Sequence, residues 1–311
     1  MKLRQSGLVL IQVLLIFALV AIIASSLLYR QATLFGRTLA LEDWSQRQAW
    51  LLSGEQLGLA ALTNADFDGF DQWFGPFELE AYQSLESQGE IYLLFSDLSG
   101  RLNLNWLIPE HPNFDAAKAG LEAITNQVET GEANLLRDIP DWLDPNSSAG
   151  FIYERYDPPF SHAGSAFNDA SELRLVEGVG RLLMPEITPH ISFLPSTSQL
   201  NINAVEPDLW AAMMPRIPYE LLNQIGEPGS RQLADLILHE DVRNIAREIP
   251  QYLLTDQRQY VRLVVMIVED EREHVLTSII ELLQPDNPVV IRRSQQPDEP
   301  LPERELQQGA F

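Results

Sequence analysis

The sequence contains no cysteine. Its absence excludes disulfide bonds, thiolate metal sites and a cysteine nucleophile. It does not fix the compartment, because an exported protein can fold without disulfide bonds. The 311 residues are 45% hydrophobic and 21% charged. This composition supports a packed core rather than a disordered chain.

Basic residues are scarce, with 21 Lys and Arg against 44 Asp and Glu. The formal net charge is −23, and residues 1–50 carry five basic and only two acidic residues, so the negative charge belongs to the rest of the chain. A surface this acidic repels phosphate backbones and anionic lipid headgroups. The composition therefore argues against nucleic acid as a partner.

Catalytic motifs are also missing. The chain has no Gly-x-Ser-x-Gly, no Walker loop and no complete Gly-x-Gly-x-x-Gly. The five histidines are scattered, and His239-Glu240 begins like a zinc-protease helix but has Arg243 where the second histidine is needed. We predict no enzymatic activity. The alternative of a membrane-anchored hydrolase requires a convergent Ser/His/Asp or two-carboxylate site, which the spacing does not show.

What the chain does have is an uninterrupted apolar run, Leu8–Leu28, preceded by Lys2 and Arg4. As a helix these residues extend about 31 Å, enough to cross a hydrocarbon core. The preceding basic residues favour a cytoplasmic N-terminus and a periplasmic remainder, anchored once in the inner membrane. The alternative is a removable signal peptide, but its apolar region is usually shorter.

The helical pattern continues beyond the apolar run to about Leu62. A short leader ending in Gly7 before such a helix resembles type IV pilins and type II secretion pseudopilins. The resemblance implies that a prepilin peptidase cuts after Gly7 and that the new N-terminus, Leu8, is methylated. That family usually has Glu at the fifth mature position, where this chain has Gln12. The Glu neutralises a neighbouring subunit's terminal ammonium, so its absence suggests a minor subunit at the filament tip.

Strand patterns lie at both ends of the remaining chain. Residues 91–95 and 102–105 predict a hairpin, and 260–268, 274–283 and 289–293 predict an antiparallel three-stranded meander. Helical periods fall between them, at 114–143, 206–214 and 231–238. The predicted fold class is α+β: a pilin-like long N-terminal helix on an antiparallel sheet, with a large all-helical insert.

This pattern divides the chain into seven predicted parts. They are a leader (1–7), a membrane-spanning helix (8–28), its amphipathic continuation (29–62), a first part of the pilin-like domain (63–108), a helical insert (109–198), a second part of the pilin-like domain (199–294) and a disordered tail rich in Pro, Gln and Glu (295–311).

Five motifs, in order along the chain, resemble the minor pseudopilin K family of type II secretion (the general secretion pathway protein K family). They are the sequences at 49–62, 97–105, 141–144, 171–179 and 200–205. The resemblance implies a non-enzymatic subunit at the pseudopilus tip that supports export of folded proteins. It also implies partnership with minor pseudopilins of types I and J. A minor subunit of a type IV pilus is the nearest alternative.

The same resemblance implies a calcium site in the loop 141–156, where Asp141, Asp144, Asn146 and Glu154 offer oxygen ligands. The expected acidic pair is replaced by Ser147-Ser148-Ala149-Gly150-Phe151, so a solvated Asx turn is an equal alternative. If calcium binds there, we expect a structural role.

Two other motifs have simpler explanations. Residues 64–69 (NADFDG) resemble half of an EF-hand loop, but Gly75 stands where the bidentate Glu is required, so we predict a turn that ends the long helix. Residues 177–181 (EGVGR) fit the helical hairpin of DNA-binding proteins. A membrane-tethered DNA-binding protein is therefore a rival hypothesis, although Glu172 and Glu177 flank the hairpin and favour a purely structural role.

Overall fold

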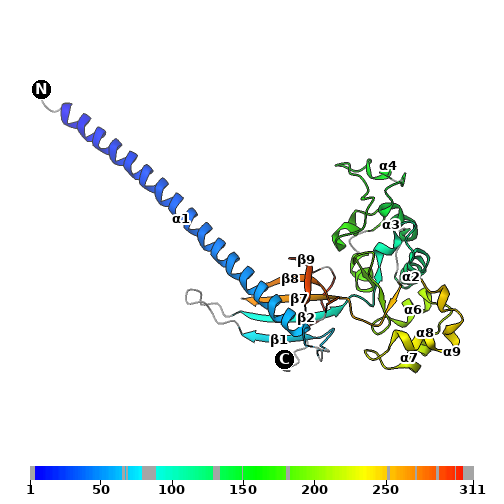
Figure 1. Cartoon of the computed structure of the whole chain (residues 1–311). Helices are drawn as coiled ribbons and strands as arrows, with labels where there is room; N and C mark the ends of the chain where they lie inside the picture. Colours follow the sequence, from blue (N-terminus) through cyan, green and yellow to red (C-terminus); the bar gives the residue numbers. More distant parts are fainter. Residues whose placement is uncertain are drawn as a thin grey trace. The chain divides into compact units, whose positions relative to one another are not determined.

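The computed structural model describes residues 4–64, 67, 69–78, 89–128, 134–148, 150–179, 183–250, 253–269, 272–284, 287–297 and 299–303. The chain divides into two compact units, Met1–Ser53 and Gly54–Phe311. The first unit holds most of one long helix, and the second holds a sheet and many short helices (Figure 1).

The long helix α1 runs without a break over Arg4–Leu62, 59 residues, or roughly 90 Å at the usual helical rise. The prediction that the helix continues beyond the apolar run to about Leu62 is therefore confirmed. Every side chain from Leu10 to Glu42 is exposed. An apolar helix surface of this kind is stable only in lipid or against other apolar helices.

The sheet of the second unit has five antiparallel strands in the order β1-β2-β7-β8-β9. They are β1 (Trp73–Glu78), β2 (Glu90–Asp97), β7 (Tyr260–Glu269), β8 (Arg272–Glu281) and β9 (Val289–Ser294). The predicted C-terminal meander is confirmed as β7, β8 and β9. Because β2 pairs with β7 along its whole length, the long segment between these two strands lies outside the five-stranded sheet.

Two glycines let the end of α1 approach one face of the sheet. A Cβ atom at Gly54 would lie 2.5 Å from Val265 Cγ1, and one at Gly58 would lie 2.4 Å from Leu263 Cδ2. Glycine lowers the helix propensity at both positions, and here it is required for close packing. The opposite face carries a separate buried cluster: Trp73, Tyr92, Leu94, Val264 and Met266.

The segment between β2 and β7 forms a helical part with short pairs of strands. In chain order its elements are β3 (Leu102–Asn103), η1 (Leu104–Leu107), α2 (Phe114–Gln127), α3 (Leu135–Leu143), α4 (Gly150–Tyr153), η2 (Ala170–Leu175), α5 (Met184–Ile187), η3 (Thr188–His190), β4 (Ile191–Ser192), β5 (Leu200–Asn201), α6 (Pro207–Met213), α7 (Tyr219–Ile225), α8 (Leu233–Leu238), α9 (Glu240–Arg243), η4 (Ala246–Glu248) and β6 (Leu254–Thr255).

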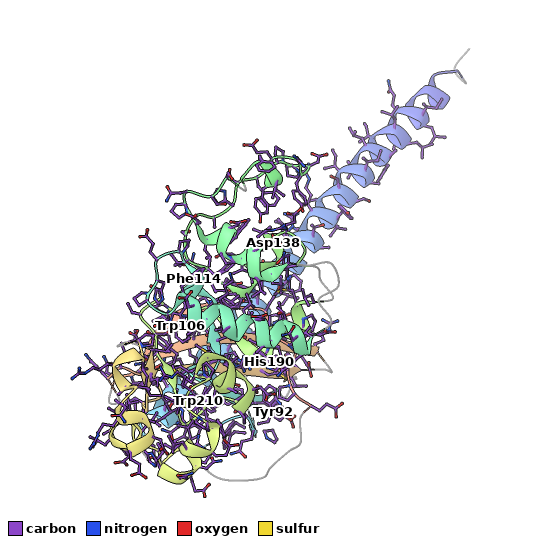
Figure 2. All side chains as sticks on the ribbon, turned by 90° about the vertical axis from the view of Figure 1, so that its right-hand side faces the viewer. Tyr92, Trp106, Phe114, Asp138, His190 and Trp210 are labelled. Carbon is purple, nitrogen blue, oxygen red and sulfur yellow. The ribbon has the colours of Figure 1, made fainter. Side chains whose placement is uncertain are left out.

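One hydrophobic core serves this whole segment, from Leu102 to Leu254. Figure 2 shows Trp106 and Trp210 within it, and both side chains are almost fully buried. The core therefore continues past residue 198, where the sequence-based division placed the end of the insert. That division of the chain into parts stays a prediction, but packing joins 200–254 to the helices rather than to the sheet.

Two predictions about this unit are wrong. Residues 102–105 do not pair with 91–95: β3 is parallel to β4, and the next residues form the 3₁₀ helix η1. The reason is that the asparagines of this segment are buried and bonded to distant backbone. The tail predicted to be disordered from 295 is anchored at two of its described residues, since Glu299 is ion-paired and Leu301 packs on the cluster around Trp73.

The predicted mixed α and β architecture with an antiparallel sheet is confirmed. Sheet and helical part together bury most large apolar side chains of the second unit, whereas α1 leaves those of its first half exposed. Function is therefore to be sought on α1 and on the loops of the helical part.

Candidate functional site

The residues predicted for processing and assembly all lie on α1. Gly7 and Leu8 are helical and fall within its first two turns. Gln12 follows one turn later, among exposed leucine and isoleucine side chains. Its amide is the only polar group in the run from Leu8 to Ala24. The structure places these residues, whereas cleavage and methylation stay predictions.

The apolar surface of α1 is the largest exposed feature of the described residues. From Leu10 onward the helix is long and apolar enough to cross a membrane, and none of that apolar stretch is buried. Its exposed side chains are Leu10, Ile11, Val13, Leu14, Leu15, Ile16, Phe17, Leu19, Val20, Ile22, Ile23, Leu27 and Leu28. A contiguous apolar surface of this size marks a lipid or protein interface.

A buried carboxylate fixes the end of α1 to the sheet. The Glu55 side chain is completely buried and accepts hydrogen bonds from Arg293 Nη2 at 2.7 Å and Nε at 2.9 Å, and from the hydroxyl of Ser278. The bond to Glu55 holds the pKa of the Arg293 guanidinium above its usual value. Sequence analysis missed Glu55, although an acid between Gly54 and Gly58 on the apolar side of an amphipathic helix was a usable signal.

Buried asparagines stabilise the first segment of the helical part, directly after β2. Asn103 Nδ2 donates to Leu194 O at 3.2 Å and to Ser198 Oγ at 2.8 Å, and its Oδ1 accepts from Leu194 N. Asn105 Nδ2 donates to Phe167 O at 2.9 Å and to Leu194 O at 2.8 Å, and its Oδ1 accepts from Phe167 N at 2.7 Å. These side chains connect segments 60 to 95 residues apart, so the motif at 97–105 is a structural junction.

A second junction forms around the motif at 200–205. Asn203 Oδ1 accepts from Gly229 N and Arg231 N, both at 2.9 Å. Arg231 is 1% exposed and donates to Ile202 O at 2.8 Å and to Asn223 Oδ1 at 2.7 Å. A buried arginine needs such a full set of acceptors, and here it ties α7 to β5. Sequence analysis missed it.

The predicted calcium ligands do not converge. Asp144 Oδ1 accepts from Asn146 N at 2.8 Å, which is an Asx turn, and Asp141 Oδ1 accepts from Ser147 Oγ at 3.4 Å. Glu154 is exposed. Among the described residues no three His, Cys, Asp or Glu side chains are grouped to hold a metal ion. The described side chains therefore fit the Asx-turn alternative, and the calcium site stays a prediction.

Aromatic packing holds this loop instead. Trp142 and Tyr153 meet edge to face with centroids 5.0 Å apart, and Phe160 lies 5.4 Å from Tyr153 and 5.3 Å from Tyr156. Phe151 and Tyr156 remain about half exposed. In Figure 1 the loop with α4 extends away from α3. The loop thus presents two half-exposed aromatic side chains.

Two other predicted motifs are only partly described. In the EF-hand-like stretch, Asp66 and Asp68 lie outside the described residues, and α1 ends at Leu62 as expected. In the hairpin, Gly180 and Arg181 lie outside them as well. Before these, Gly178 has a φ of 79° and follows η2, while Arg174 is exposed beside acidic residues. The described part shows no basic surface for a phosphate backbone.

One buried acid in the second unit lies away from α1. Asp97, at the end of β2, accepts from Arg258 Nε at 3.0 Å, from Ser99 N at 2.8 Å and from Asn201 Nδ2 at 3.3 Å. Burial raises the pKa of Asp97, although Arg258 opposes the change. With every oxygen engaged by a structural donor, Asp97 joins the sheet to the β5 segment.

Comparison with known proteins gives consistent results. Residues 100–196 match the family described as "Type II secretion system (T2SS), protein K". The chain is 29% identical over 262 residues to type II secretion system protein K of Pseudomonas aeruginosa, covering 77% of this chain and 78% of that one. It is 30% identical over 236 residues to the Aeromonas hydrophila protein of the same name, covering 68% and 70%.

A solved structure shares the fold. The match is to a crystal structure of the GspK–GspI–GspJ complex from the type 2 secretion system of enterotoxigenic Escherichia coli, with a TM-score of 0.65 and 20% identity. It covers 84% of this chain and 99% of the matched chain. At this identity the likeness establishes the α+β fold alone.

Proposed function

The chain belongs to the type II secretion system protein K family of minor pseudopilins, and we propose that it caps the tip of the pseudopilus. Such a subunit supports pseudopilus assembly and the export of folded proteins. The observation that carries the proposal is the combination, in one chain of this family, of an exposed apolar helix and a large helical part inserted between β2 and β7.

The mechanism is geometric. The apolar surface of α1 packs among the helices of neighbouring subunits, where lipid gives little net hydrophobic drive and close packing supplies the stability. The helical part is far larger than the loop that a five-stranded sheet needs to connect β2 and β7. Its bulk blocks addition of a further subunit above it, which makes the subunit a cap.

The partners are the other minor pseudopilins. The related K protein from enterotoxigenic E. coli was crystallised in complex with GspI and GspJ. By family membership we infer that this chain assembles with its own I and J counterparts. Gln12 supports this position, because a tip subunit has no neighbour above it whose terminal ammonium needs a carboxylate.

Processing and location follow from the same helix. A prepilin peptidase cuts after Gly7, and Leu8 becomes the methylated N-terminus. Lys2 and Arg4 keep the leader on the cytoplasmic side, so α1 crosses the inner membrane once and the unit Gly54–Phe311 lies in the periplasm. We assign no enzymatic step and no nucleic acid partner, and calcium is not part of the proposal because its predicted ligands do not converge.

The proposal is tested by capturing the tagged full chain from detergent extracts of a strain with an intact secretion system. We expect two other minor pseudopilins in the captured material, and a mature peptide that begins with methylated Leu8 in mass spectrometry. Recovery of the major pseudopilin alone would contradict the tip position. A native N-terminus near Leu27 would contradict the retained helix and with it the whole proposal.

A further inference from the structure

Two arginines, Arg101 and Arg262, lie where the sheet meets the helical part, in a chain whose net charge is −23. Arg262, on β7, is 3% exposed, and the Arg101 side chain, just before β3, is 16% exposed. Arg101 Nη1 also donates to Thr188 O of the helical part at 3.4 Å. A buried guanidinium group from the sheet and a partly buried one from the start of the helical part therefore lie at the same junction.

A single carboxylate from the C-terminal segment lies between them. Glu299 forms ion pairs with Arg101 Nη1 and with Arg262 Nη1, and Arg101 Nη2 donates to Glu299 Oε1 at 3.2 Å. The Glu299 side chain is only 8% exposed. Carboxylate–guanidinium contacts with more than one bond are strong and directional, and burial reduces their screening by salt.

The residues that follow continue over the sheet. Leu301 packs on the buried cluster around Trp73, on the face opposite α1. The Trp73 indole Nε1 donates to Pro302 O at 3.1 Å. The segment is thus held at one end by charge and at the other by apolar packing and a hydrogen bond.

We propose that residues 299–303, here called the C-terminal clasp, lock the helical part to the sheet. Without Glu299, Arg101 and Arg262 lose the carboxylate that they share, and removing one partner of a buried ion pair is strongly destabilising. The junction around Arg101 would then open while the two cores stay folded. The proposal does not depend on a tip position, because every contact of the clasp lies within Gly54–Phe311.

The test uses the full chain in detergent and limited trypsin digestion followed by mass spectrometry. Glu299→Gln should increase the rate of cleavage after Arg101 by about tenfold, because local opening exposes this site. The matched control is Glu303→Gln, since Glu303 is exposed on the same segment. Cleavage after the exposed Arg155 should be unchanged in both. Equal rates after Arg101 in the two variants, or an equal increase at Arg155, would overturn the proposal.

A second pair of variants separates charge pairing from a general loss of stability. Adding Arg262→Gln to Glu299→Gln removes one of the two guanidiniums and should return cleavage after Arg101 toward the wild-type rate. Truncation after Glu303 should leave that rate unchanged, whereas truncation after Ser294 should raise it as Glu299→Gln does. If the double variant is cleaved faster than the single variant, Glu299 acts by packing and the proposed clasp is wrong.

Discussion

At the scale of single residues, two of the buried carboxylates join separate elements of the second unit. Glu55 joins α1 to β8 and β9, and Asp97 joins β2 to the β5 segment. The two partners of the Glu55 ion pair differ in exposure, because the Glu55 side chain is fully buried while the Arg293 side chain is 49% exposed. The cost of removing a partner therefore depends on which one is removed.

Arg293→Ala should be more destabilising than Glu55→Gln. The first leaves a buried carboxylate without its counter-charge, at a cost of about 3 kcal/mol or more in the free energy of unfolding. The second leaves a neutral amide that still accepts from Ser278, and Arg293 can turn toward solvent. Urea unfolding of both variants measures the difference. Arg272→Ala, an exposed arginine on β8, is the control and should change stability by about 0.5 kcal/mol or less. Equal losses in the free energy of unfolding for Arg293→Ala and Glu55→Gln would contradict this prediction.

Asp97 predicts a pH dependence with a definite sign. Burial raises its pKa in the folded state above the unfolded value, which is about 3.9. The folded protein therefore takes up this proton first, so the stability contributed by Asp97 is complete below the unfolded pKa and is lost as the pH rises through the folded pKa. Relative to Asp97→Asn, the wild type should gain stability as the pH falls from neutral toward 4. If the wild type instead loses stability relative to Asp97→Asn over that range, the Arg258 ion pair, rather than burial, dominates the pKa of Asp97.

At the scale of elements, α1 meets the sheet through glycines that its own helix propensity disfavours. Gly58→Ala places a Cβ atom 2.4 Å from Leu263 Cδ2. We expect overpacking to cost about 1–3 kcal/mol, more than the roughly 1 kcal/mol gained in helix propensity. Gly36→Ala is the matched control, because no atom lies within 4 Å of its Cβ position. Thermal unfolding in detergent should show a lower midpoint for the first variant only.

The loop with α4 is held by its aromatic side chains, so it should not need an ion. Tyr153→Ala removes the ring that contacts both Trp142 and Phe160 and should cost about 3–5 kcal/mol, whereas Tyr153→Phe should cost much less. Chelation with EGTA, or addition of calcium, should leave the thermal midpoint of the wild type unchanged. A midpoint that rises with calcium and no longer rises in Asp144→Asn would establish the site that the sequence predicted.

At the scale of the whole molecule, one exposed apolar helix is joined to a strongly acidic folded unit. The full chain should remain in the membrane fraction after alkaline extraction, because its helix is long enough to span the hydrocarbon core. A chain that begins at Tyr29 should be recovered in the soluble fraction. Full-length protein released by alkali would contradict the spanning helix.

The sequence by itself determined the elements whose signal is local. An apolar run followed by a 3.6-residue period is a local signal for a helix, so the end of α1 near Leu62 was predicted from the sequence. The β-rich runs of β7, β8 and β9 and their short connections predicted the meander in the same way. The five motifs pointed to the family, and the excess of acid argued against nucleic acid.

Only the tertiary structure decided what depends on distant partners. The alternation at 102–105 looks like a strand, but its asparagines bond to backbone at 167 and 194, and those bonds outweigh the local pattern. The polar composition after 295 looks disordered, but Glu299 meets two arginines that lie 198 and 37 residues away along the chain. Periodicity reports a residue's neighbours in the chain, whereas pairing of buried polar groups depends on neighbours in space.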